Sequence, residues 1–330
     1  MNIPVNHLKK FQKIASHIKS NGILPIHSYI KFGCGAICKN TGTAFVNYNL
    51  VEANEEILVD ENDLFSLVNQ TAASVVSISI KKGKVELWDG RDKIVSQTVK
   101  YTLFGNPVPA SKERIELSPE FIDAVEKASH FSQLAKDLPT HYGYVHVGEK
   151  TVCSGDGIIA FHCPVEENMK IVIDSRVAQT ISKHNILSFG ESDNSYYFYS
   201  EDAVFGFSKS EVGWFDIRRI FAQSREYAFT LEASDPTSFN SLSRQLSKTA
   251  LVTISAGKIE MNDSELDKYH ERPLDNVKIQ EPFNYNPDRM NALIEGLGLE
   301  ELDFSDSKPA YYVSSKDTRA TAIIAKIKYP

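Results

Sequence analysis

An internal repeat constrains the fold of this 330-residue chain more than any other feature. The repeated unit is an amphipathic helix followed by three short strands, and the helices are predicted to begin near residues 7, 61, 119, 175, 236 and 287. Successive helix starts are therefore 51 to 61 residues apart. Three of the starts combine an N-capping residue with a following proline, at Ser118-Pro119, Asp235-Pro236 and Asn286-Pro287. Such a period indicates six copies of one supersecondary element.

The first helix illustrates the pattern. It is predicted over residues 7–20, with Asn6 as its N-cap. Leu8, Phe11 and Ile18 recur at helical spacing and form its apolar face.

One unit of about 55 residues is too small to bury its own core, so neighbouring units are expected to pair. Pairing consecutive units predicts three domains, at 1–108, 109–222 and 223–330. Each domain is expected to have an α+β fold in which two helices pack on antiparallel sheets. Three unrelated α+β domains are the alternative, but the spacing and the capped helix starts recur together, which favours the repeat.

The composition is that of an ordinary cytoplasmic protein. Apolar residues make up 42% and charged residues 24% of the chain, and no apolar run approaches the roughly 18 residues of a membrane helix. The N-terminus lacks a signal-peptide layout, and four cysteines do not form a disulfide scaffold. A net charge of −7 argues against a strongly basic protein that coats nucleic acid, although it leaves room for a locally basic surface. We therefore expect a cytoplasmic chain with no membrane partner.

Motifs of catalysis and of cofactor binding are absent from the sequence. No Gly-x-x-x-x-Gly-Lys-Ser/Thr loop occurs, and no carboxylate pair is accompanied by a histidine or cysteine cluster. Cys34, Cys38 and the pair His162-Cys163 would make a zinc site of loose spacing, so thiols packed in a strand core are the favoured interpretation. We expect no metal, no cofactor and no enzymatic activity. A hydrolase with an unrecognised carboxylate pair is the competing hypothesis.

Four short segments occur in the same order as in a known protein family. They are Ile23-Leu24-Pro25-Ile26, Ser154-Gly155-Asp156-Gly157, Gly213-Trp214-Phe215-Asp216-Ile217-Arg218-Arg219-Ile220 and Phe283-Asn284-Tyr285. Together with the repeat they resemble the bacterial processivity clamp, the beta subunit of DNA polymerase III, in a divergent or phage-encoded form. That family has a Leu-Pro-Ile segment, a Thr-Asp-Gly turn, a Gly-x-Phe-Pro-Asp-Tyr-x-Arg-Val segment and a Phe-Asn helix start at the corresponding places.

The resemblance implies a ring of two copies joined head to tail, so that this chain forms half of a closed ring. Its helices would line a hole around duplex DNA and contact it without regard to sequence. The implied function is a DNA sliding clamp, a processivity factor that tethers the replicative polymerase and binds peptides of polymerases and of the clamp loader. The implied location is the cytoplasm, on the nucleoid. The alternative is a clamp-fold module that binds polymerase-type peptides without encircling DNA.

The charge on the predicted helices agrees with a lining that faces DNA. Together the six helices carry +3, which leaves −10 for the rest of the chain, although the second and third helices are acidic. The lysines of the first helix lie opposite its apolar face, a pattern that a merely solvated face would also show. The predicted DNA-binding residues are Lys9, Lys10, Lys13, Lys19, Arg176, Lys183, Arg244 and Lys248.

The resemblance also implies an apolar pocket between the second and third domains for short linear peptides. The matching positions are Gly155, Gly157, Ala160, Phe215, Ile220, Ile324 and Ile327. Phe215 replaces a proline of the family pattern and Ala160 a larger aliphatic residue, so the preferred peptide is expected to differ. Ordinary inter-domain core is the alternative role for Ile220 and Ile324. For the contact between subunits, first domain to third, the predicted residues are Leu103, Phe104 and Leu246.

Overall fold

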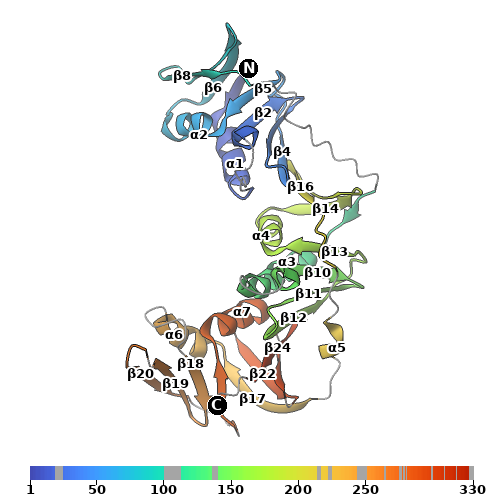
Figure 1. The fold of residues 1–330 in the computed structure, drawn as a ribbon, viewed down its shortest axis with the longest axis vertical. Coiled ribbons are helices and arrows are strands. Elements are labelled where there is room, and N and C mark those ends of the chain that lie inside the picture. The colour runs from blue at the N-terminus through green and yellow to red at the C-terminus, as the bar shows by residue number, and fades with distance from the viewer. Residues whose placement is uncertain are drawn as a thin grey trace. The chain divides into compact units, whose positions relative to one another are not determined.

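The predicted repeat is present six times, as one strand, one helix and three antiparallel strands, and the expected α+β class is confirmed. The structure is a computed structural model, and its described residues are 1–18, 25–99, 113–135, 140–213, 217–221, 225–243, 251–263, 265–274, 277, 279, 281–298, 300–307, 309–316 and 318–326. They form two compact units: unit 1 (Met1–Leu117 with Lys183–Lys209) and unit 2 (Ser118–Ser182 with Ser210–Pro330) (Figure 1).

The repeats follow one another along the chain. Repeats one and two contain β1 (Asn2–Pro4), α1 (Val5–Ala15), β2 (Tyr29–Gly33), β3 (Ala36–Asn40), β4 (Ala44–Asn49), β5 (Ile57–Asp60), α2 (Glu61–Gln70), β6 (Val75–Lys81), β7 (Lys84–Trp88) and β8 (Lys93–Gln97). Repeats three and four contain β9 (Ile115–Glu116), α3 (Pro119–Ser132), β10 (Tyr144–Gly148), β11 (Thr151–Gly155), β12 (Ile159–Pro164), β13 (Ile171–Asp174), α4 (Ser175–Ser182), β14 (Ile186–Glu191), β15 (Ser195–Ser200) and β16 (Ala203–Ser208). Repeats five and six contain β17 (Glu226–Glu232), α6 (Ser234–Ser243), β18 (Leu251–Ser255), β19 (Lys258–Asp263), β20 (Lys268–Pro273), β21 (Phe283–Tyr285), α7 (Pro287–Leu297), β22 (Glu301–Asp306), β23 (Ala310–Ser314) and β24 (Thr321–Ala325). Shorter helical segments are η1 (Pro25–Ser28), η3 (Gln133–Ala135), η4 (Thr140–Gly143) and α5 (Arg218–Phe221).

Consecutive repeats exchange their first strands. β1 pairs with β6 of the second repeat, and β5 pairs back with β2 of the first. The same exchange joins β9 to β14 and β13 to β10, and then β17 to β22 and β21 to β18. The strands therefore tie repeat one to two, three to four and five to six. The predicted domain boundaries at 108/109 and 222/223 lie outside the described residues, so the three domain ranges stay a prediction.

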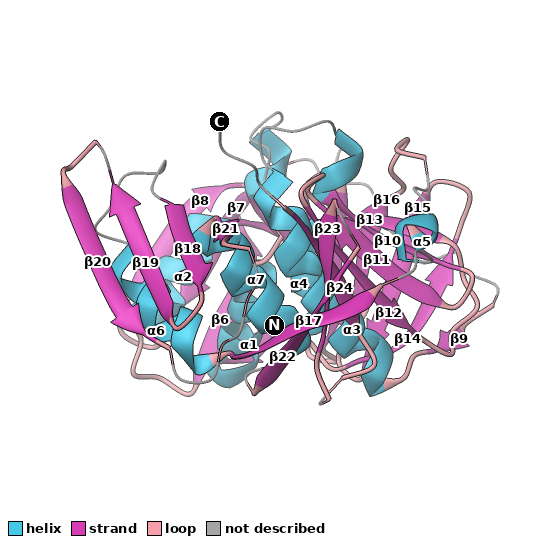
Figure 2. Ribbon diagram, turned by 90° about the horizontal axis from the view of Figure 1, so that it is seen from below, coloured by secondary structure: helices cyan, strands magenta, loops and turns pink. Residues whose placement is uncertain are grey.

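Two strand meanders join edge to edge within each unit. In unit 1, β4 pairs with β16 and completes an eight-stranded sheet of order β5-β2-β3-β4-β16-β15-β14-β9 (Figure 1). In unit 2, β12 pairs with β24 and completes an eight-stranded sheet of order β13-β10-β11-β12-β24-β23-β22-β17. A four-stranded sheet accompanies each, of order β1-β6-β7-β8 in unit 1 and β20-β19-β18-β21 in unit 2. In Figure 2, β20, β19 and β18 lie side by side next to α6 and α7.

Local signals explain where the helices begin. Asp60, Ser118 and Asn286 cap α2, α3 and α7 through side-chain oxygens that accept backbone N–H groups. The prediction for the first helix was wrong at both ends, because α1 begins at Val5 after Pro4 and ends at Ala15, without a capping side chain. The fourth helix, α4, begins at the predicted residue 175 and ends at Ser182.

The cysteines are only partly a core feature. Cys38 is buried, whereas Cys34 is exposed in the β2–β3 turn, where its φ of 55° is left-handed. Cys163 is half-buried. The expectation of core thiols was therefore wrong for Cys34. No helix among the described residues has the length and apolar character needed to span a membrane.

Candidate DNA-facing and peptide-binding surfaces

The first basic surface is the polar face of α1. Lys9, Lys10 and Lys13 are exposed there, opposite a buried apolar stripe. The Lys10 ammonium pairs with the Asp202 carboxylate, between β15 and β16, and lies 5.9 Å from the centre of the Tyr48 ring. The hydrogen bond to Asp202 raises the pKa of Lys10. Lys10 therefore stays protonated, but its charge is already paired with that of the Asp202 carboxylate.

Two of the predicted DNA-binding residues, Lys13 and Lys183, lie near a pair of histidines close to the end of α1. Nδ1 of His17 lies 3.2 Å from Nε2 of His184, and the His184 ring stacks on Phe205 of β16 with centroids 4.7 Å apart. Burial, then the charges of Lys183 and Lys13, lowers the pKa of His17. Burial also lowers the pKa of His184 to about 4, with help from His17 and the two lysines. At neutral pH both imidazoles are neutral, and the lysines carry the positive charge of this cluster.

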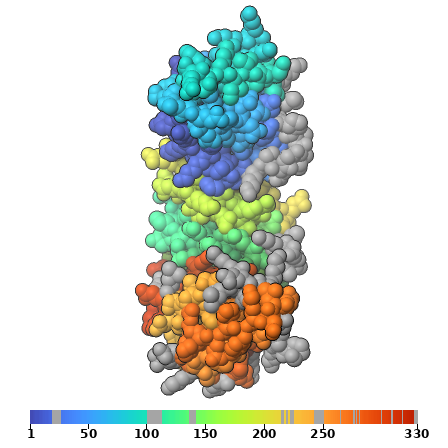
Figure 3. All heavy atoms as spheres, turned by 90° about the vertical axis from the view of Figure 1, so that its left-hand side faces the viewer, coloured from blue at the N-terminus to red at the C-terminus, as the bar shows by residue number. Residues whose placement is uncertain are grey.

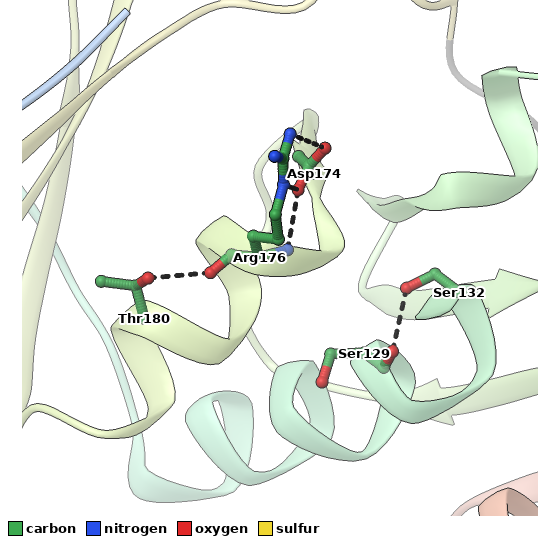
Figure 4. Close-up of polar contacts among 5 residues, drawn as sticks. All are labelled: Ser129, Ser132, Asp174, Arg176 and Thr180. Carbon is green, nitrogen blue, oxygen red and sulfur yellow. Dashed lines mark hydrogen bonds and ion pairs between the residues drawn. The ribbon is translucent and has the colours of Figure 1, made fainter. Parts of the chain in front are cut away.

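Arg176 lies at the start of α4 and faces Asp174 (Figure 4). Its Nε and Nη2 donate to the two Asp174 oxygens at 3.0 and 3.2 Å, and its backbone N–H donates to the same carboxylate at 2.7 Å. The side chain is nevertheless 79% exposed. A phosphate that reaches Arg176 would compete with Asp174 for one guanidinium.

Helices α3 and α4 pack against each other, and both contain buried hydroxyl residues. Ser129 and Ser132 of α3 and Thr180 of α4 are buried. Their hydroxyls donate to carbonyls of their own helices at 2.7, 3.1 and 2.8 Å, so these three groups are satisfied although buried. Figure 4 shows the bonds of Ser132 and Thr180. The packing fixes α4, and with it the position of Arg176.

Acidic residues on α2 and α3 have basic neighbours. Glu61 lies 2.6 Å from the Lys39 ammonium, and Asp123 lies 2.8 Å from that of Lys127 on the same helix. The acidity that the sequence places on these helices is therefore partly neutralised. The other predicted DNA-binding residues, Lys19, Arg244 and Lys248, lie outside the described residues.

The turn Gly155-Asp156-Gly157 is held from within unit 2. A Cβ at Gly155 would come within 2.6 Å of the Ile159 carbonyl oxygen, and Gly157 has a φ of +87°. One oxygen of the buried Asp156 accepts two backbone N–H groups of the turn, both at 2.8 Å. The other oxygen accepts Nε–H of Arg289, on α7, at 2.7 Å. These residues position β11 and β12 against α7.

The remaining predicted pocket residues occupy opposite faces of the unit 2 sheet. Ile324 is 1% exposed and lies on the helix side, where Phe161 packs on Phe131 of α3 with ring centroids 5.1 Å apart. Ala160 pairs with Ile323, so these two side chains share the outer face, away from the helices. The structure thus places Ile324 in the core and its neighbour Ile323 beside Ala160.

A short helix that the sequence did not predict covers part of this outer face. Phe221, the last residue of α5, packs against Ala310, Tyr312 and Ile323. The preceding Ile220 is 41% exposed, and its carbonyl accepts a hydrogen bond from the Tyr312 hydroxyl. A helix of one turn is too short to show a helical period in the sequence. The one available signal was the aromatic residue Phe221, which directly follows the segment Gly213 to Ile220. The other predicted residues, Phe215, Ile327, Leu103, Phe104 and Leu246, lie outside the described residues.

Comparison with known proteins identifies the fold. No family model and no curated protein matches the sequence. Among solved structures, the beta subunit of DNA polymerase from Streptococcus pyogenes matches with a TM-score of 0.83 and 14% identity, covering 99% of both chains. A putative DNA polymerase III beta subunit from Eubacterium rectale matches with a TM-score of 0.82 and 14% identity, covering 99% of both chains. The Helicobacter pylori beta clamp bound to a DNA ligase peptide matches with a TM-score of 0.82 and 14% identity, covering 100% of both chains.

These matches define the class of structure: the chain has the fold of a bacterial DNA sliding clamp. More narrowly, the fold is that of the DNA polymerase III beta subunit along almost its entire length. The fold implied by the sequence resemblance is thereby confirmed.

Proposed function

We propose that this protein is a DNA sliding clamp, a non-catalytic processivity factor that encircles duplex DNA and tethers the replicative polymerase. The observation that carries the proposal is the strand-exchanged six-repeat fold, which is similar to polymerase III beta subunits over 99% of both chains. Topological linkage retains a ring on DNA while weak, sequence-independent phosphate contacts let it move. The protein would then act in the cytoplasm, on nucleoid DNA.

The described basic residues support a surface that faces DNA. Lys9, Lys13 and Lys183 are exposed cations on or beside the helices that the proposal places around the duplex. Lys10 and Arg176 would exchange a carboxylate for a phosphate oxygen on binding. Several contacts of this kind, each weak, provide affinity that falls with salt and carries no sequence preference.

Two open sheet edges support a head-to-tail homodimer. Among the described residues, β8 and β20 are two of the eight strands at the edges of the four sheets, each with a hydrogen-bonded neighbour on one side only, and both belong to surface sheets (teal and orange in Figure 3). Edge strands present unpaired N–H and C=O groups that seek a partner strand. Pairing β8 of one copy with β20 of a second would satisfy both edges and close after two copies. Leu103, Phe104 and Leu246 remain the predicted apolar part of this contact.

The outer face of the unit 2 sheet supports a role in peptide binding. The Helicobacter pylori clamp is solved with a DNA ligase peptide, and we propose that this chain likewise binds linear peptides of polymerases and of the clamp loader. Ala160 and Ile323 lie side by side on this face, and Ile220 is exposed near it. An apolar surface beside a sheet can anchor the side chains of an extended peptide.

Retention on closed circular DNA tests the proposal. The protein is mixed with linear plasmid, and the DNA ends are then joined by a ligase. Gel filtration removes free protein, and the circle is finally cut once. We expect co-elution with the circle and release after the cut, because a ring slides off a free end. A linear plasmid with both ends blocked by streptavidin should retain the protein again. Equal retention on circular and open linear DNA would contradict encirclement.

A second candidate function is a clamp-fold module that binds peptides without encircling DNA. The ion pairs of Lys10 with Asp202 and of Arg176 with Asp174 favour it, since they reduce the charge available to phosphates. Peptide binding without any retention on the circle would support this candidate.

A further inference from the structure

An aromatic side chain of this chain already occupies the outer face of the unit 2 sheet. We define the aromatic seat as His162 of β12, Ala310 and Tyr312 of β23, and Ile323 of β24. The Phe221 ring lies 5.1 Å from the His162 ring and 6.0 Å from the Tyr312 ring, the latter edge-on at 85°. These separations are in the favourable range for aromatic pairs. The seat therefore accepts a phenylalanine ring.

The seat and its occupant belong to elements of different stability. All four seat residues are on paired strands of the eight-stranded sheet. Phe221 ends a four-residue helix, and such a helix has little stability of its own. Besides the ring, α5 contacts the seat through the hydrogen bond from the Tyr312 hydroxyl to the Ile220 carbonyl. Because Phe221 is only half-buried, its ring can leave the seat. The seat keeps its shape because its residues are on paired strands.

We propose that Phe221 is an internal occupant of the aromatic seat, and that partner peptides bind by displacing it with an aromatic side chain of their own. The inference rests on the proposed function, in which this face receives linear peptides. Without Phe221, the cluster of Ala310, Tyr312 and Ile323 would lose the partly buried apolar side chain that packs on it. Apolar surface uncovered in this way favours contact with another apolar side chain.

Charge beside the seat narrows the partner further. The Arg225 guanidinium carbon lies 5.1 Å from the centre of the Tyr312 ring. A peptide whose aromatic residue is next to a carboxylate would bring that carboxylate to the guanidinium. The partner is therefore a short peptide that carries an aromatic residue beside an acidic one.

Because Phe221 must leave before a peptide binds, the protein binds the peptide more weakly than an open seat would. The observed affinity is the intrinsic affinity multiplied by the fraction of molecules whose seat is open. If Phe221 fills the seat in about nine molecules of ten, removing its ring raises the affinity about tenfold. A purely structural Phe221 would give no such gain, because its removal would only loosen the surface.

Fluorescence polarisation with a labelled peptide, Gly-Ser-Glu-Phe-Ser-Gly, tests the inference on the full chain. We expect Phe221→Ala to bind it about tenfold more tightly than the unchanged protein. Tyr227→Ala, which truncates an aromatic side chain 69% exposed elsewhere in unit 2, should not change the affinity. The same peptide with alanine in place of phenylalanine should gain nothing from Phe221→Ala. Unchanged or weaker binding of the phenylalanine peptide by Phe221→Ala would overturn the proposal.

A second measurement avoids any change in folding. 4-Fluorophenylalanine at position 221 should show a ¹⁹F resonance that moves towards the solvent-exposed value as the peptide saturates the protein. A resonance that stays in place at saturation would overturn displacement. Retention on circular DNA is measured on the same samples: retention without displacement refutes this inference alone, whereas loss of retention refutes the proposed function.

Discussion

At the scale of single residues, burial keeps the two imidazoles of the His17–His184 pair uncharged. Burial lowers the pKa of both imidazoles, that of His184 to about 4, below the ordinary value of 6.5. Below pH 6.5 the unfolded chain therefore takes up protons that the folded pair resists. The stabilising contribution is present above pH 6.5 and is lost as the pH falls towards 4. Allowing for solvent screening, we expect a loss of about 1 kcal/mol between pH 7 and pH 5.

Urea unfolding at several pH values measures this loss. The double variant His17→Gln with His184→Gln should flatten the dependence of the unfolding free energy on pH. His7→Gln, in the same unit but paired with Tyr48, is the matched control and should keep the slope of the unchanged protein. A slope that is identical in all three proteins would show that the pair does not titrate as its burial requires.

Individual residues also show where sequence reasoning succeeds. The prediction of Gly157 as a turn glycine is confirmed by its φ of +87°, because Asp-Gly signals a turn locally. The sequence could not decide which of Ile323 and Ile324 faces away from the helices. The run Ala322-Ile323-Ile324-Ala325 is apolar at every position, so alternation does not say which residues face the helices.

At the scale of elements, local signals predicted four helix starts and missed the strand pairing. The starts of α2, α3, α4 and α7 agree with prediction because capping residues and apolar faces lie close together in sequence. The first strand of each repeat pairs instead with the neighbouring repeat, and β4 pairs with β16 more than 150 residues away. Pairing over such separations depends on the fit between surfaces, which no local pattern reports.

The junction of β4 with β16 contains a glycine whose replacement should be costly. Gly206 lies opposite Phe45, and a Cβ there would come within 1.9 Å of the Phe45 ring. The ring would have to leave its place beside Tyr197, 6.1 Å away. We expect Gly206→Ala to lower the unfolding free energy by about 1–3 kcal/mol. Thermal and urea unfolding measure the effect.

A double-mutant cycle isolates the cause of this loss. In a Phe45→Ala background the added methyl group meets no ring, so Gly206→Ala should cost much less. Gly213→Ala is the matched control, since nothing lies within 4 Å of the added Cβ. Equal costs of Gly206→Ala in both backgrounds would rule out the clash with Phe45.

At the scale of the whole molecule, the edges left open by the fold predict its assembly. Each of the four sheets ends in two edge strands among the described residues, and the proposed contact between copies uses two of these, β8 and β20. A chain of 37.0 kDa that pairs these edges head to tail should have about twice that mass in solution at micromolar concentration. Light scattering coupled to gel filtration measures the mass. A dilution series should show a dimer that separates without larger species, because the proposed head-to-tail contact is complete after two copies. A monomer at every concentration would refute the ring, while a ladder of growing oligomers would show that the head-to-tail contact does not close.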